Sequence, residues 1–346
     1  MPGLAFSDID DAVLLTQNTL IKRGAFVDMQ TDLIDHVAVR EMWKARQKKF
    51  AGGENWETEY QMDHNHSARA VGLYEDDGSS IGDTMVKGEV APRHVNAHYI
   101  YDLREKAFQR GGTAIVNLIQ TKYVAMMVAW FEYLEETLWG KPTDSTDERT
   151  PYGIGYWIVK NATEGFYGAN PAGFTAGRGG ISTGTYARYA NYTAAYTKIT
   201  KEDLIRKMRR AARQIKFRSP VSHATPKVGG SKNGIYTNDT VIGLMEEVLE
   251  ANNMSLGNDL AAKDGRTLFK GTPLSYAPYL DNDTQNPVYM LDWMWLAVGV
   301  LEGWDNNLQA PYMVPNKHLV RRVDLDATLN MVCTDPRRQA VFHVDG

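Results

Sequence analysis

A segment near the C-terminus alternates strictly between apolar and polar residues. Its apolar residues take every second position: Val323, Leu325, Ala327, Leu329, Met331 and Cys333. The positions between them are polar: Asp324, Asp326, Thr328 and Asn330. Because successive side chains of a strand point to opposite faces, this period of two predicts a long strand with one buried face. We expect its aspartates to face solvent or a partner.

The residues that follow favour a turn and a second strand. Thr334-Asp335-Pro336-Arg337 has turn chemistry, because proline fixes φ and aspartate can bond its own backbone. Residues 340–344 are then mostly apolar. We predict a long antiparallel hairpin at the C-terminus, with Arg337 and Arg338 at its turn. This ending is architectural, and no catalytic element is visible in it.

The composition is that of an ordinary folded protein. The chain has 346 residues, enough for about two or three hydrophobic cores. Its residues are 43% apolar and 23% charged, and its formal net charge is −4. That charge excludes a strongly basic nucleic-acid-binding protein but leaves room for a local basic patch. The single cysteine, Cys333, cannot form an intrachain disulfide, which favours a reducing compartment.

No segment reads as a membrane span or a signal peptide. The first eleven residues contain three acids and no basic residue. The most apolar stretch, residues 124–131, is too short to cross a bilayer. We therefore expect a soluble intracellular product.

Three segments carry a helical pattern. Residues 113–140 present a broad apolar surface over about 25 residues, and Gly140 and Pro142 end the segment. Residues 201–217 form a second amphipathic pattern. A third helix is expected over about residues 238–253.

The N-terminal 50 residues have too little apolar surface for a core of their own. Residues 1–50 should therefore lie as an arm on the body of the chain or on a neighbouring subunit. Residues 54–66 and 90–104 alternate like strands, and a turn-rich segment separates them. We interpret residues 51–104 as a long two-stranded hairpin. A lone hairpin is marginally stable in water, so we expect this one to pack against another chain.

Residues 141–197 are rich in Gly, Thr, Tyr and Asn and show no sustained period. A segment of this length is usually functional or needs partner contacts to become ordered. Its glycine clusters, at residues 153–158 and 177–182, fail the dinucleotide-binding fingerprint and are interpreted as turns. The chain has no nucleophile elbow, and carboxylate pairs such as Glu135-Glu136 fall on surface-type helix positions.

Four of the eight histidines fall on the proposed hairpin: His64, His66, His94 and His98. Each pair shares a strand face, so a suitable register would gather nitrogen ligands for a zinc-like ion. No HExxH motif is present, because Val95 stands where glutamate is needed. We favour exposed or interface imidazoles, with a protonation-sensitive contact as a further alternative. We assign no metal, cofactor or catalytic residue.

The helix at residues 201–217 has seven basic residues and only two acidic ones, Glu202 and Asp203. A basic helix face can bind phosphates without sequence preference, although it is more often solvated or salt-bridged. The candidate contacts with DNA or with an acidic neighbour are Arg206, Lys207, Arg209, Arg210 and Arg213. The sequence does not decide between these partners.

Four stretches together resemble one known family. They read PVYMLDW (287–293), TLNMVCTDPRRQAVFHV (328–344), GIYTNDTVIGLMEEVLEANN (234–253) and KDGRTLFKGTPLSYAPYL (263–280). They resemble the major capsid proteins of tailed bacteriophages, which have the Hong Kong 97-type capsid fold. The resemblance covers roughly residues 233–346, and the order of elements fits the remainder.

The resemblance implies an α+β fold divided into an arm, a loop and two domains. These are an N-terminal arm (1–50), an extended loop (51–104), a peripheral domain (105–222 and 319–346) and an axial domain (223–318). The peripheral domain would hold a spine helix at about 113–140 and the loop-rich insertion at 141–197.

The resemblance also implies a function. The chain would self-assemble into hexameric and pentameric capsomers of an icosahedral shell that encloses double-stranded DNA. Its partners would be itself, portal and scaffolding proteins, and packaged DNA by non-specific contact. It would have no enzymatic activity and no membrane contact, and would assemble in the host cytoplasm and reside in the virion.

Two other interpretations remain open: a soluble enzyme with an unrecognised active site, and a nucleic-acid-binding module that uses the helix at 201–217. Eight Trp and 18 Tyr residues favour a protein with large interfaces, where these residue types are enriched. Assembly size separates a shell protein from a typical enzyme, which forms a small closed oligomer.

Overall fold

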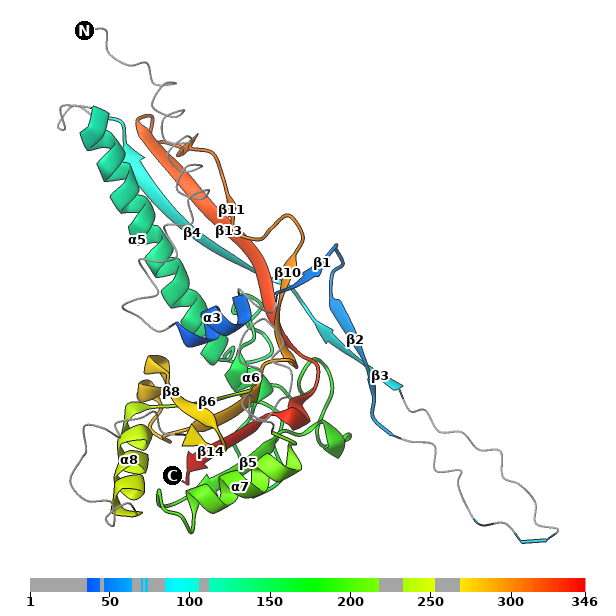
Figure 1. Ribbon diagram of the computed structural model, residues 1–346. Coiled ribbons are helices and arrows are strands. Elements are labelled where there is room, and N and C mark those ends of the chain that lie inside the picture. Colours follow the sequence, from blue (N-terminus) through cyan, green and yellow to red (C-terminus); the bar gives the residue numbers. More distant parts are fainter. Residues whose placement is uncertain are drawn as a thin grey trace.

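A computed structural model of the chain describes residues 36–43, 47–63, 70, 72–73, 85–105, 112–217, 233–252 and 268–345. Its architecture is α+β, with two six-stranded sheets and a two-stranded hairpin among these residues. One sheet and a long helix form an elongated upper part, the second sheet lies below it, and the hairpin projects away from both (Figure 1).

The first sheet is built around the long strand that the period of two predicts. This strand, β13, spans Val320–Cys333. It pairs antiparallel with β4 (Arg93–Asp102) along one edge and with β10 (Leu296–Leu301) along the other. Three shorter strands complete the sheet: β1 (Gln47–Phe50), parallel to β10, and β11 (Asn307–Leu308) and β12 (Tyr312–Met313), antiparallel to β13.

The apolar face of β13 is buried as predicted, but the expected exposure of its polar face is wrong. Asp324 is only 5% exposed, and Thr328 and Asn330 are also buried. The Asp324 carboxylate accepts hydrogen bonds from Tyr312 Oη at 2.5 Å and Arg322 Nε at 2.7 Å. Neighbouring elements therefore cover both faces of the strand, and the polar face is satisfied by side-chain partners.

The predicted long helix is present as α5, which spans Gly112–Trp139. It packs against β4, where the Tyr99 and Tyr123 rings meet edge to face at 6.4 Å. Trp130, Leu134 and Leu138 share one continuous core with the apolar face of β13. In the part of the chain that the structure describes, no helix is both long and apolar enough to cross a membrane.

The second sheet corrects the prediction of a C-terminal hairpin. After β13 a short 3-10 turn, η4 (Pro336–Arg338), carries the chain away from the first sheet. The last strand, β14 (Ala340–Val344), pairs parallel with β5 (Tyr192–Tyr196) and antiparallel with β9 (Val288–Asp292). Three more strands extend this sheet: β6 (Asn233–Thr237), β8 (Thr272–Tyr276) and β7 (Leu268–Phe269). The turn was predicted correctly, but the pairing was wrong, because local sequence does not specify which sheet receives the strand.

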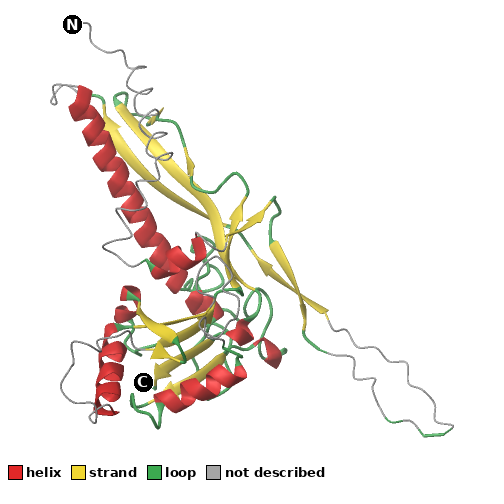
Figure 2. Cartoon of the chain, in the orientation of Figure 1, coloured by secondary structure: helices red, strands yellow, loops and turns green. Residues whose placement is uncertain are grey.

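Two helices flank the second sheet (Figure 2). One is α7 (Leu204–Gln214), which packs against β5 and β14, and the other is α8 (Asp239–Asn252), which contacts β8. Both lie within the helical segments that the sequence predicts. A second hydrophobic core, which includes Met208, Val241 and Phe342, lies between these helices and the sheet.

The projecting hairpin is present but is built differently from the prediction. Its strands are β2 (Trp56–Gln61) and β3 (Met85–Val90), paired antiparallel. The strand predicted over 90–104 corresponds instead to β4, which belongs to the first sheet. Residues 91–92, which belong to no strand, separate β3 from β4, so the alternation that continues across them spans two different sheets.

The arm is anchored to the body where the structure describes it. A short helix, α3 (Val37–Trp43), contacts α5. Glu135 of α5, only 7% exposed, accepts the backbone N–H groups of Ala38 and Val39 at 3.0 Å and Trp139 Nε1 at 2.7 Å. The surface position expected for Glu135 is therefore wrong, because its carboxylate caps a helix that is remote in sequence.

Candidate interaction surfaces

Helix α7 has one apolar and one basic side. Leu204, Met208, Ala211 and Ala212 are buried in the second core. This spacing of three and four residues places them on one side of a helix, so the basic residues between them point outward. Burial of the apolar side fixes the direction in which the basic side faces.

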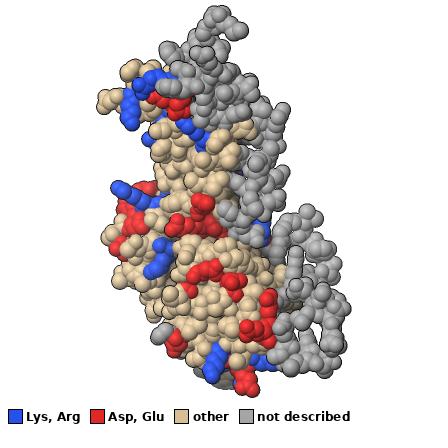
Figure 3. Space-filling model, turned by 90° about the vertical axis from the view of Figure 1, so that its left-hand side faces the viewer, with Lys and Arg blue, Asp and Glu red and all other residues tan. Residues whose placement is uncertain are grey.

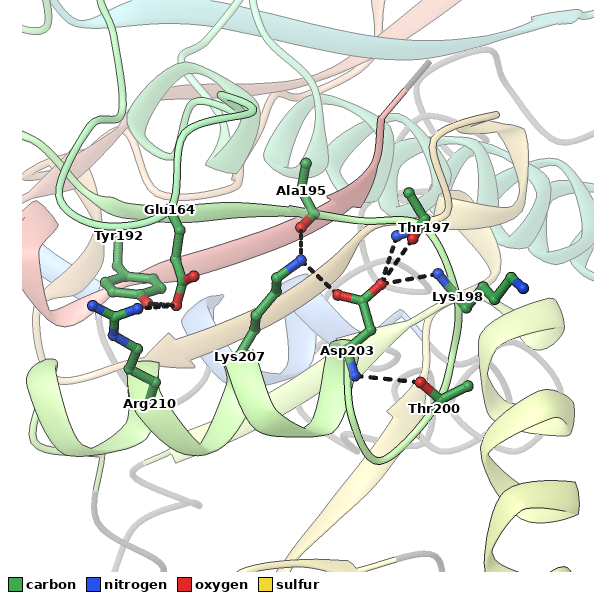
Figure 4. Close-up of polar contacts among 9 residues, drawn as sticks. All are labelled: Glu164, Tyr192, Ala195, Thr197, Lys198, Thr200, Asp203, Lys207 and Arg210. Carbon is green, nitrogen blue, oxygen red and sulfur yellow. Dashed lines mark hydrogen bonds and ion pairs between the residues drawn. The ribbon is translucent and has the colours of Figure 1, made fainter.

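Asp203 and Lys207 tie the start of α7 to the preceding loop (Figure 4). Asp203 Oδ2 accepts the backbone N–H groups of Thr197 at 2.8 Å and Lys198 at 3.0 Å. Lys207 Nζ donates to Asp203 Oδ1 at 2.5 Å and to the Ala195 carbonyl at 2.7 Å. Burial opposes ionisation of Asp203, but these hydrogen bonds outweigh it and lower the pKa of Asp203 to about 2.

Arg210 is held in a second contact, on the neighbouring turn of the helix (Figure 4). Its guanidinium lies 3.1 Å from Glu164 Oε1, which also accepts the Tyr192 hydroxyl at 3.2 Å. Burial, and then the Glu164 charge, raise the pKa of Tyr192, so the phenol stays protonated and donates. Arg210 therefore links α7 to the loop before β5.

The structure thus divides the five predicted contact residues into two groups. Lys207 and Arg210 are engaged within the chain. Arg206, Arg209 and Arg213 are exposed, and no ion pair or hydrogen bond joins them to another described residue. The i,i+4 spacing of Asp203 and Lys207 is readable in the sequence, whereas the contact with Glu164 is not.

Arg178 is the main site residue that sequence reasoning missed. It is 0% exposed, and its guanidinium donates to the carbonyls of Trp157 at 2.8 Å, Gly168 at 2.8 Å and Ala169 at 2.9 Å. Burial lowers the pKa of Arg178 to about 10, so it remains charged at neutral pH. The glycine cluster around it does form a turn, as predicted, closed by an Arg178–Ile181 bridge.

This turn fixes the base of the projecting hairpin. Gly179 O accepts the backbone N–H of Glu89 on β3 at 2.9 Å. On β2, the Tyr60 hydroxyl donates to the Cys333 carbonyl at 3.0 Å. Gly88 lies so close to this loop that an added Cβ would meet the Tyr60 ring at 2.8 Å and Ile181 at 3.2 Å. The loop-rich segment 141–197 is therefore ordered by contacts within the chain and serves as a seat for the hairpin.

The opposite face of the hairpin is exposed and carries more acid than base. Glu57 is directly opposite Glu89, and Glu59 is opposite Lys87. Lys87 Nζ reaches Glu57 at 2.6 Å, and all four side chains belong to exposed residues. Like charges directly opposite each other on a strand pair are destabilising. This face is therefore a candidate interface with a partner that supplies cations.

The remaining candidates for chemistry do not combine into a catalytic site among the described residues. His94 Nδ1 is 2.7 Å from Thr328 Oγ1, and the pairing of β4 with β13 removes the register in which the hairpin histidines would have met. His64 and His66 lie outside the described residues. No cluster of three potential metal ligands occurs in the described part of the chain. Burial raises the pKa of the Cys333 thiol, which leaves it unreactive.

A cavity of about 710 Å³ lies where α5 ends, beside α6 (Ile154–Trp157) and η3 (Pro278–Asn282). Its charged lining residues include Lys160, which pairs with Asp283, and Lys141. The described lining contains no histidine, cysteine or serine.

Comparison with known proteins identifies the fold. No family model and no curated protein matches the chain. The capsid asymmetric unit of cyanophage A-1(L) is similar, with a TM-score of 0.63 at 12% identity over 90% of this chain and 93% of that one. The capsid of the native GTA particle gives a TM-score of 0.54 at 11% identity, covering 91% and 92%. The holo-SrpI encapsulin complex from Synechococcus elongatus PCC 7942 gives 0.51 at 9% identity, covering 91% and 89%. The α+β, Hong Kong 97-type capsid fold predicted from the sequence is therefore confirmed.

Proposed function

We propose that the chain is the major capsid protein of a tailed bacteriophage, the subunit of an icosahedral shell. The observation that carries the proposal is the agreement in fold with a phage capsid subunit over nine-tenths of both chains. The projecting β2–β3 hairpin supports it, because a sheet of only two strands is marginally stable without a partner.

The proposed partners follow from the same assignment. The subunit binds copies of itself in hexameric and pentameric capsomers, and it meets portal and scaffolding proteins and packaged double-stranded DNA. It assembles in the host cytoplasm and resides in the virion, and it has no enzymatic activity. We retain the division into arm, extended loop, peripheral domain and axial domain as part of this proposal.

Expression of the chain alone and with its scaffolding protein tests the proposal. Native mass measurement and electron microscopy should detect capsomers or closed particles. A persistent monomer or a small closed oligomer, together with turnover of a small molecule, would overturn the assignment and favour the enzyme interpretation.

The similarity to an encapsulin supports a second candidate, a shell that encloses proteins in place of a genome. The contents of the particles distinguish the two. Particles purified from a phage-producing host should contain double-stranded DNA under the first proposal. Particles that hold a defined protein cargo and no DNA would support the second.

A further inference from the structure

We propose that Arg206, Arg209 and Arg213 form a binding site for the phosphates of double-stranded DNA. The inference rests on the proposed function, because a shell around a genome brings DNA to its subunits. The site consists of the arginines of α7 that form no ion pair or hydrogen bond with another described residue. Lys207 and Arg210 hold α7 in place, and the other three arginines extend into solvent.

The three arginines form a row along one side of the helix. Their spacing of three and four residues corresponds to about 4.5 and 6 Å along the axis, or about 10 Å in total. The buried side of α7 faces the second sheet, so the row points away from the body. Guanidinium groups can donate two parallel hydrogen bonds to a phosphate, which suits arginine better than lysine to this ligand.

The charge of the row is not compensated by the helix itself. Residues 204–217 contain no acidic residue, and Asp203 is occupied by Lys207 and by two backbone N–H groups. Glu202 stands four residues before Arg206, but no ion pair joins the two among the described residues. Like charges at positions i and i+4 destabilise a helix by a few tenths of a kcal/mol, roughly. A polyanion would relieve this repulsion.

The row carries positive charge alone, which favours DNA over an acidic protein surface as its partner. On the face of the molecule that carries α5, acidic and basic side chains are interspersed (Figure 3). The acidic face of the hairpin likewise contains Lys87 between its glutamates. DNA instead offers phosphates alone, roughly one charge per 1.7 Å of its axis. A row of three cations without an acid among them fits that ligand.

The salt dependence of DNA binding tests the proposal. We would measure binding of a fluorescent 60-base-pair duplex to unassembled full-length subunits from low to moderate NaCl. The test variant is Arg206→Gln/Arg209→Gln/Arg213→Gln. The control, Lys49→Gln/Arg149→Gln/Lys317→Gln, removes the same charge from exposed residues elsewhere. Thermal melting should show that both variants remain folded.

The plot of log K against log[NaCl] has a negative slope. We expect the test variant to reduce the magnitude of this slope by about 2 to 3, since each lost phosphate contact contributes about 0.9. The control should retain the slope of the natural protein. Equal losses in both variants, or no loss in the test variant, would overturn the site. Undetectable binding by the natural protein at low salt would also overturn it. If the test variant binds DNA normally but fails to form capsomers, the row instead contacts an acidic protein partner.

The test is independent of shell formation. DNA binding is measured on subunits, whereas particle formation is measured separately by microscopy. If the natural protein binds DNA through the row but forms no particles, the proposed function fails and the site stands. If particles form and the row has no effect on binding, the site fails and the proposed function stands.

Discussion

Replacement of Arg178 by methionine should destabilise the subunit more than any exposed arginine replacement. The guanidinium donates to three carbonyls, those of Trp157, Gly168 and Ala169, and it is fully buried. Each buried acceptor that loses its partner costs about 1–3 kcal/mol, which gives about 2–6 kcal/mol for the carbonyls of Trp157 and Gly168, while the bond to Ala169 is only partly buried. Methionine keeps part of the packing and avoids the cost of burying a charge. We therefore expect a net loss of about 2–5 kcal/mol, from the buried carbonyls that lose their donor.

Urea unfolding of the unassembled subunit measures this loss. With an m-value of about 3 kcal/mol/M, a loss of about 4 kcal/mol lowers the midpoint by about 1.3 M. Arg149→Met is the matched control, because Arg149 is exposed and a surface replacement usually changes stability by less than about 0.5 kcal/mol. Arg178→Lys should fall between the two, since one ammonium cannot match the fork of donors.

The consequence should extend to the hairpin. Gly179, next to Arg178, accepts the backbone N–H of Glu89 on β3. Amide hydrogen exchange in residues 85–90 should therefore accelerate in Arg178→Met and remain unchanged in Arg149→Met. A loss below about 1 kcal/mol, or unchanged exchange in β3, would refute the idea that Arg178 orders the seat of the hairpin.

Three further outcomes are expected. Leu329→Ala should cost about 2–5 kcal/mol as a core truncation. Asp324→Ala should cost about 1–3 kcal/mol, because it removes the hydrogen bonds that the buried carboxylate accepts from Tyr312 and Arg322; a neutral Asp324→Ala in urea melts would contradict this. Burial raises the pKa of Glu135 despite its three hydrogen bonds. The contribution of this group to stability is therefore fully present below the ordinary glutamate pKa and is lost as the pH rises through the raised one. The difference in melting temperature between the natural protein and Glu135→Gln should therefore shrink or change sign as the pH rises between the ordinary and the raised pKa. A difference that stays constant with pH would refute this prediction. Replacing residues 63–83 by Asn-Gly should leave the subunit folded but prevent closed shells, and normal particles in micrographs would contradict an intersubunit role.

Local periodicity predicted the elements of this fold well. The segments that became α5 and α7 were read from their apolar faces, α8 from its helix start signal, and β13 from a period of two. Each signal lies within one continuous stretch of chain, so no distant partner is needed to recognise it. The turn after β13 was also readable, because Asp335 accepts the Arg337 backbone N–H as turn chemistry requires.

Pairing and burial were not readable in the same way. β4 pairs with β13 although the two strands lie more than 200 residues apart in the sequence, and the sequence of neither strand specifies its partner. Arg178 and Glu135 were assigned to a turn and to a surface, because charged residues are rarely buried. Apart from Trp139, which donates to Glu135, their partners are backbone groups, which leave no mark in the sequence. Among the site residues, the basic character of α7 was predicted from the sequence. The pairing of Glu164 with Arg210 could not be predicted, because the two residues meet only in the folded chain.

The buried polar face of β13 explains how so long a strand keeps one register. Asn96 of β4 donates to Asp326 at 2.6 Å, and Thr328 forms a hydrogen bond with His94, which is also on β4. Asn330 donates to the Ala91 carbonyl at 2.6 Å and accepts from the Tyr152 backbone. A slip of one residue would break all of these contacts and turn the aspartates into the apolar core. The polar face therefore fixes β13 against β4, and through β4 it fixes the base of the hairpin relative to the long helix that β4 covers.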